Sequence, residues 1–192
     1  MSLLDSLTQQ ITGSALSGLA GQLGADEGTT QSAITAALPM IVGALAKNAS
    51  TNDGAASLTN ALSKDHDGSI LDNLGGFLSS TDNGSGAGIL GHIFGGNRGM
   101  VEAGLSQMSG LGQGQAGNLL ENLAPLVMGM LGKTKSQQGL DASGIAGLLL
   151  GERNNAQQTS GAAMSMISGL LDRDGDGSVI DDIGGLLGKF LK

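Results

Sequence analysis

The sequence predicts an all-α protein built from eight or nine short, glycine-rich helices in two similar units. Apolar residues recur at helical spacing along most of the chain, whereas alternating strand patterns are missing and aromatic and β-branched residues are few. The 192 residues include 35 glycines and three Phe, without Trp or Tyr, so the core must consist of Leu, Ile, Ala, Val and Met. Glycine costs about 1 kcal/mol relative to alanine inside a helix, so this content favours short helices with many caps.

The first predicted helix covers residues 3–23. Its leucines and Ile11 recur at steps of three to five residues, which is the spacing of an amphipathic helix. Glycines inside this range, of which Gly13 is the first, loosen the helix, and Gly24 ends it.

A second helix is expected from Asp26, which can cap it through Thr29, to Lys47. Pro39 should bend this helix because proline lacks the amide that the helical ladder needs. Apolar residues at helical steps form the predicted buried stripe: Ile34, Leu38, Ile41, Val42 and Leu45.

A polar turn over residues 48–54 precedes a short helix with Leu58 and Leu62, and an acidic loop then leads into a helix over residues 70–78. Residues 79–88, SSTDNGSGAG, are interpreted as a linker because Ser, Asn, Asp and Gly favour turns and cannot anchor a core. This places a first helical repeat at residues 1–78 and a second at residues 89–192.

The second half repeats the first. Residues 104–133 match residues 18–47 at a constant offset of 86, with eight identities in thirty positions that include Pro39 and Pro125, the two prolines of the chain. The acidic loop recurs at an offset of 109, so the second half carries 23 additional residues, which lie within Thr134 to Met166.

Three segments resemble a known family: LAGQLGADEGTTQSAITAALPMIVGALAKNA from Leu19, its second copy, and ILGHIFGG at residues 89–96. They are similar to the bacterial domain of unknown function 937 (DUF937) family, which includes the YidB-like proteins. The most specific element is LGHIFGG followed by the run from Ala124 to Gly129, and the resemblance extends from about Gly18 onward. It implies a small bacterial helical protein with no assigned activity, in which an acidic tail loop is not a general feature.

Charge and composition exclude several classes of function. The net charge is −8 and the nine Lys and Arg residues are scattered, so nucleic acid is not expected as a partner. Cysteine is absent, and the two histidines, His66 and His92, are isolated in sequence and are expected to be structural or exposed. No nucleophile, base and orienting group can be assembled, so we do not expect an enzyme. No secretory signal or apolar run of about 20 residues is found, and a cytoplasmic protein is expected.

The tail contains the first half of a calcium loop, DRDGDGS. Asp172, Asp174 and Asp176 occupy loop positions 1, 3 and 5, Gly177 is the turn glycine at position 6, and Ser178 offers its carbonyl at position 7. The bidentate acid expected at position 12 is replaced by Ile183. The predicted shell is therefore completed by an acid at position 10 or 11, Asp181 or Asp182.

A turn and a helix cap are the alternative interpretation of these loops. Ser178 and Asp181 have the spacing of a capping box, and so do Ser69 and Asp72 in the first loop. Capping does not explain three crowded carboxylates, since unneutralised like charges repel one another. The first loop is the weaker metal candidate, because Ser63 replaces its first acid and Lys64 follows; its acidic residues are Asp65, Asp67 and Asp72.

These observations favour a non-enzymatic calcium-binding helical protein with a structural or interaction role. One Ca²⁺ would clamp the start of its last helix. Calcium is expected rather than magnesium because an incomplete cage suits the flexible coordination of the larger ion. The alternative is a membrane-surface or self-association module in which the acidic loops serve only as caps. A protein partner or homo-oligomer fits either function, and a membrane surface is the less favoured partner.

Overall fold

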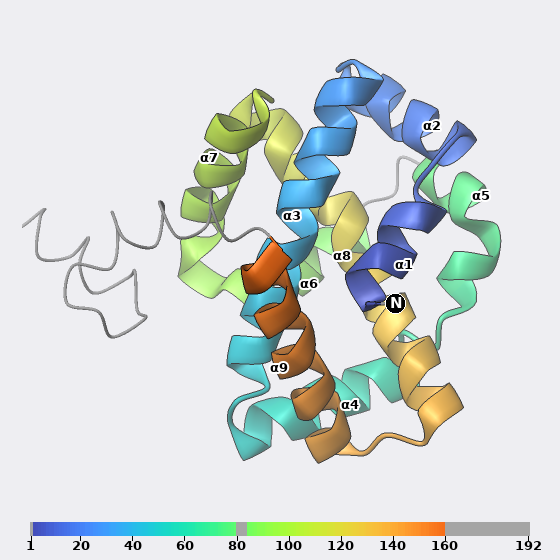
Figure 1. The fold of residues 1–192 in the computed structure, drawn as a ribbon, viewed down its shortest axis with the longest axis vertical. Helices are drawn as coiled ribbons and strands as arrows, with labels where there is room; N and C mark the ends of the chain where they lie inside the picture. The colour runs from blue at the N-terminus through green and yellow to red at the C-terminus, as the bar shows by residue number, and fades with distance from the viewer. Residues whose placement is uncertain (1, 80–83, 160–192) are drawn as a thin grey trace, which may run out of the picture. The chain divides into compact units, whose positions relative to one another are not determined.

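The computed structural model describes residues 2–79 and 84–159, which form nine α-helices and two short 3₁₀ helices (Figure 1). Within these residues no strand is present, and the predicted all-α fold is confirmed. The elements are α1 (Leu3–Gln10), α2 (Ser14–Leu23), α3 (Glu27–Asn48), α4 (Asn52–Lys64), η1 (Ser69–Asn73), α5 (Leu74–Ser79), α6 (Gly84–Phe94), η2 (Gly95–Asn97), α7 (Arg98–Ser109), α8 (Gln113–Gln138) and α9 (Ala142–Thr159). Three of them are not short: α3 has 22 residues, α8 has 26 and α9 has 18.

The single helix expected over residues 3–23 is in fact two helices, α1 and α2. Gly13, the N-cap of α2, has φ +57°, a backbone conformation outside the right-handed helix that glycine adopts without strain. Ile11 and Leu19, on either side of this break, are both buried in the same core. The apolar spacing therefore continues from α1 into α2 and does not reveal the break. Gly24 ends α2, as predicted, and it adopts the left-handed conformation.

Helix α3 follows the sequence prediction closely. Asp26 caps it by accepting a hydrogen bond from Thr29 N at 2.8 Å, and the whole predicted apolar stripe is buried. Pro39 lies inside the helix. Among the described residues, α3 is also the one helix long and apolar enough to cross a membrane, but half of the apolar window is buried inside the fold, so this is weak evidence for a span.

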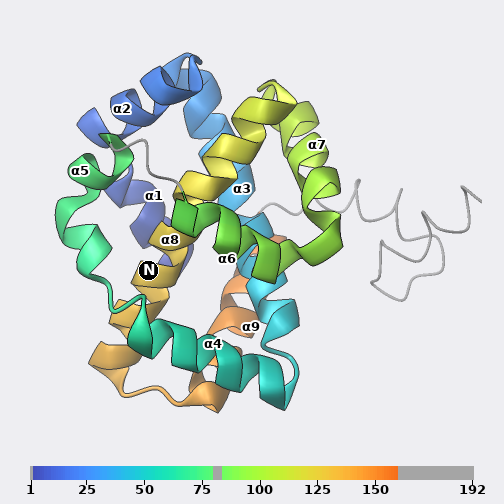
Figure 2. The ribbon, with the colours of Figure 1, turned by 180° about the vertical axis from the view of Figure 1, so that it is seen from behind.

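Helix α8 occupies the centre of the compact unit Met1–Arg153, as Figures 1 and 2 show from opposite sides. It contacts α1, α2, α3, α4, α6, α7 and η1. Consequently the residues from Asn122 to Gly132 are buried almost without interruption, with Pro125 inside the helix. Helices from both predicted halves therefore contribute to one core.

Close helix packing depends on glycines that the sequence did not single out. A Cβ added to Gly86 in α6 would lie 2.0 Å from the Glu121 backbone oxygen in α8, and one added to Gly132 in α8 would lie 1.6 Å from the His66 backbone oxygen. By contrast, a Cβ added to Gly18 or to Gly21 in α2 would meet nothing within 4 Å. Gly86 also belonged to the expected linker over residues 79–88, but residues 84–88 are the first residues of α6.

Candidate binding pocket and acidic loops

The predicted calcium ligands of the tail lie outside the described residues. They are Asp172, Asp174, Asp176, Ser178, Asp181 and Asp182. Their arrangement as a metal site stays a prediction.

Two carboxylates of the first acidic loop interact with groups of the protein itself. Asp67 Oδ1 accepts a hydrogen bond from the backbone nitrogen of Ser69 at 3.0 Å, which lowers the pKa of the exposed Asp67 carboxyl. Asp72 Oδ1 lies 3.9 Å from Lys133 Nζ. Asp65 is the C-cap residue of α4. Within the part of the chain that the structure describes, no three acidic or histidine side chains gather to hold a metal.

The capping box expected from Ser69 and Asp72 is not formed as predicted. The N-cap residue of η1 is Gly68, which has no side chain and adopts φ +99°, and Ser69 is the first residue of η1. Asp67 supplies the cap-like hydrogen bond instead. The reason is that the loop turns sharply at the glycine, which places Asp67 two residues before the free amide of Ser69.

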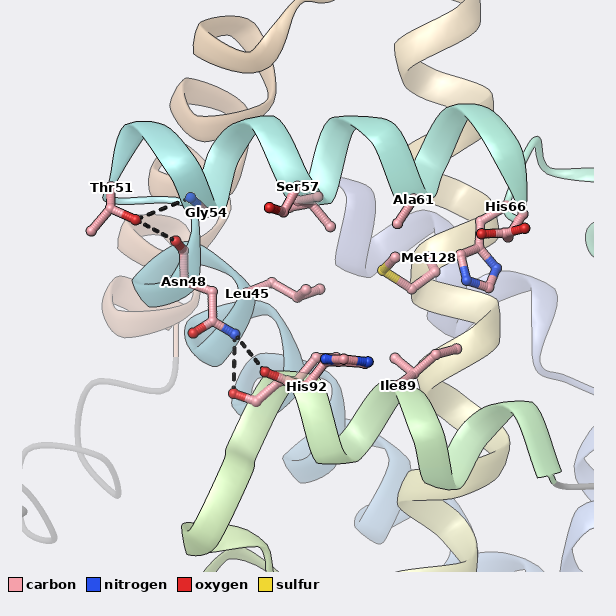
Figure 3. Close-up of a pocket in the computed structure, with 13 residues that line it drawn as sticks. Leu45, Asn48, Thr51, Gly54, Ser57, Ala61, His66, Ile89, His92 and Met128 are labelled. Atoms are coloured by element: carbon pink, nitrogen blue, oxygen red, sulfur yellow. Dashed lines mark hydrogen bonds between the residues drawn. The ribbon is translucent and has the colours of Figure 1, made fainter.

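A pocket of about 570 Å³ lies between α4 and α6, next to the last turn of α3 (Figure 3). Met128 of α8 faces it from the core side. Much of its wall is apolar and buried, and a polar set lies at its edge. The lining residues are Leu45, Asn48, Thr51, Gly54, Ser57, Leu58, Ala61, Asp65, His66, Ile89, His92, Ile93 and Met128.

Hydrogen bonds fix one end of the pocket. Asn48 Nδ2 donates to the backbone oxygens of His92 at 3.3 Å and Ile93 at 3.1 Å, and thereby joins the C-terminal ends of α3 and α6 (Figure 3). Thr51 caps α4 by accepting a hydrogen bond from Gly54 N at 3.1 Å. The turn between α3 and α4 is so tight that a Cβ on Gly54 would lie 1.9 Å from the Asn48 backbone oxygen. The walls are therefore held in place without a ligand.

His66 and His92, which the sequence suggested were isolated, line the same pocket. His66 is half-buried, and burial lowers its pKa below the ordinary 6.5, while the nearby Asp65 carboxylate acts in the opposite direction. Neither imidazole ring nor the Ser57 hydroxyl makes a hydrogen bond to another described residue. No local spacing could have revealed this pair, because His66 follows α4 whereas His92 lies in α6.

Comparison with known proteins identifies the family but no characterised relative. The family model described as bacterial protein of unknown function (DUF937) matches residues 5–134. The match begins earlier than the expected Gly18, and it does not include the acidic tail. No curated protein and no solved structure matches the chain. Because the family model covers well over half of the sequence, the chain belongs to the DUF937 family of bacterial proteins.

Proposed function

We propose that this protein is a non-enzymatic calcium-binding protein with a structural or interaction role, in which the ion clamps the start of the last helix. The observation that carries the proposal is the spacing of Asp172, Asp174 and Asp176 before Gly177. Carboxylates at alternate positions followed by a glycine supply hard oxygen ligands and the sharp turn that a calcium loop requires. Ser178 and either Asp181 or Asp182 complete the proposed shell.

The conformation of the first loop supports this assignment. At an offset of 109, Gly68 corresponds to Gly177 and Asp67 to Asp176. Gly68 turns the chain with φ +99° immediately before η1, which is the role that the glycine at position 6 has in a calcium loop. The first loop lacks an acid at the position of Asp172, which Ser63 occupies. We therefore propose that both loops share the turn conformation and that only the tail loop binds Ca²⁺.

We further propose that the two halves are structural repeats. The prolines of the sequence repeat, Pro39 and Pro125, lie inside α3 and α8, the two longest of the described helices. The helices before them end at Gly24 and Gly110, with φ of 63° and 79°. Superposing residues 18–47 on residues 104–133 tests the proposal. Unrelated directions of the paired helices after superposition would refute it.

A calcium titration of the full-length protein tests the proposed function. Calcium should bind with about one ion per chain and raise the melting temperature by mass action, whereas magnesium should do so less. Replacing both Asp174 and Asp176 by Asn should abolish the shift while leaving helical content nearly unchanged. The matched control carries Asp65→Asn and Asp67→Asn in the first loop, and it should keep the shift.

Two results would contradict the calcium function. One is the absence of any melting shift at millimolar calcium, and the other is an equal shift in the Asp174 and Asp176 variant. The acidic loops would then act only as turns and caps. Binding of the wild type to anionic vesicles, or a concentration-dependent rise in mass, would in that case favour the membrane-surface or self-association function.

A further inference from the structure

We propose that the pocket between α4 and α6 binds a small alkylamine. This inference is independent of the calcium loop, because every lining residue lies within residues 45–128. The volume of about 570 Å³ is within the range of small-molecule sites, which are apolar concavities with a few converging polar groups. The pocket has both properties.

The apolar wall would hold the hydrocarbon part of the ligand. Leu58 of α4, Ile93 of α6 and Met128 of α8 line the pocket from three helices, and each of these side chains is buried. Their positions are fixed by the core and by the Asn48 bridge between α3 and α6. Apolar surface removed from water contributes roughly 25 cal/mol per Å², so an alkyl chain placed here gains affinity without a large rearrangement.

The polar edge would select the amine. Asp65 is the one lining residue with a formal charge near neutral pH, and neither Lys nor Arg lines the pocket. The half-buried His66 ring lines the same pocket and makes no hydrogen bond to another described residue. An ammonium group can therefore pair with Asp65 and donate a hydrogen bond to a ring nitrogen of His66 or to the Ser57 hydroxyl. A carboxylate of the same size would meet one negative charge and no fixed cation.

Three probes of equal chain length test the charge preference on the full-length protein at neutral pH: octylamine, octan-1-ol and octanoate. Binding is followed by nuclear magnetic resonance, through the Met128 methyl and the ring protons of His66 and His92. We expect octylamine to bind most tightly and octanoate least tightly, with all three reporters shifting together. Octanoate binding as well as octylamine, or octylamine shifts confined to other residues, would overturn the proposal.

Matched substitutions on α4 locate the site. Ala61 faces the pocket in Figure 3, so Ala61→Phe should fill it and reduce octylamine affinity at least about tenfold. Ala56→Phe places the same ring on the exposed side of the helix and should leave the affinity unchanged. If Ala61→Phe binds octylamine as the wild type does, the pocket is not the site.

A second pair of variants tests the contribution of the Asp65 charge without placing a large side chain in the pocket. Asp65→Asn should weaken octylamine binding roughly two- to fivefold, which is the range of an exposed ion pair, and should leave octan-1-ol binding unchanged. Asp53→Asn removes a charge from the exposed start of the same helix and serves as the control. Equal losses in both variants would mean that net charge attracts the amine, and the assignment to this pocket would fail.

Discussion

The buried carboxylate of Glu152 accepts a hydrogen bond from the backbone nitrogen of Leu3 at 2.9 Å, so α9 is joined to the first turn of α1. Its second oxygen lies 3.4 Å from the nitrogen of Leu4, and Ser2 Oγ accepts from Asp5 N at 3.1 Å. The first helical amides have no partners within their own helix and carry partial positive charge. Glu152, only 6% exposed, thus satisfies two of them across 149 residues of sequence.

Replacing Glu152 should destabilise the fold. Hydrogen bonds to a charged group contribute about 1.5 to 3 kcal/mol each. The 3.4 Å bond to Leu4 is long and contributes little, so Glu152→Ala should lower the free energy of unfolding by about 2 to 3 kcal/mol, close to the value of the single Leu3 bond. Glu152→Gln keeps one acceptor and should lose less. Urea unfolding followed by circular dichroism measures both. Arg153→Gln changes the exposed neighbouring residue and should have little effect; an equal loss there would mean that the Leu3 contact is not the cause.

A second prediction concerns the contact between Gly86 and Glu121. Pro125 has no amide hydrogen for the Glu121 oxygen four residues earlier, and the backbone of Gly86 lies against that oxygen. Gly86→Ala would place a methyl group 2.0 Å from this oxygen, so α6 must shift. We expect a loss of about 1 to 3 kcal/mol in the free energy of unfolding.

Gly88 provides the control in the same helix. A Cβ at Gly88 meets nothing within 4 Å, so Gly88→Ala should be neutral or should stabilise by up to about 1 kcal/mol. Thermal unfolding of the two variants compares them directly. Equal melting temperatures for the two variants would show that the α6 and α8 backbones are farther apart than described.

Helix α3 was predictable because its signals are local. The Asp26 cap, the apolar stripe and the end near Lys47 all follow from residues within one segment, and Ile34 and Leu45 are buried as expected. The same holds for Gly24, since a glycine after the last apolar residue marks the left-handed C-cap.

The missed features depend on contacts between distant segments. The break at Gly13 could not be predicted from apolar spacing because Ile11 and Leu19, on either side of it, enter one core. His66 and His92 line one pocket only because α4 and α6 both pack against α8. Likewise, no sequence signal identifies Glu152 as a cap for α1.

A third prediction concerns Asn122, which is 1% exposed in α8. Its Nδ2 donates to Asn118 O at 2.9 Å, but its Oδ1 has no hydrogen-bond partner among the described residues. An unsatisfied buried acceptor costs about 1 to 3 kcal/mol, so Asn122→Ala removes a penalty while it leaves a cavity. Its loss of stability should therefore be smaller than the 2 to 5 kcal/mol typical of Leu119→Ala, a fully buried site in the same helix. Comparable losses in urea unfolding would mean that the amide oxygen is satisfied.

The last prediction is a pH dependence that arises from His66. Burial lowers the pKa of His66 in the folded protein below its ordinary 6.5, so the unfolded chain binds the proton more readily. The stabilising contribution is therefore fully present above pH 6.5 and is lost as the pH falls through the lowered pKa. Between about pH 7 and pH 5 the free energy of unfolding should decrease, and His66→Gln should flatten this slope. Asp65→Asn should lower the pKa of His66 further, because the carboxylate favours the protonated ring. Titration of the His66 ring proton measures the pKa, and a value above 6.5 would reverse the predicted slope.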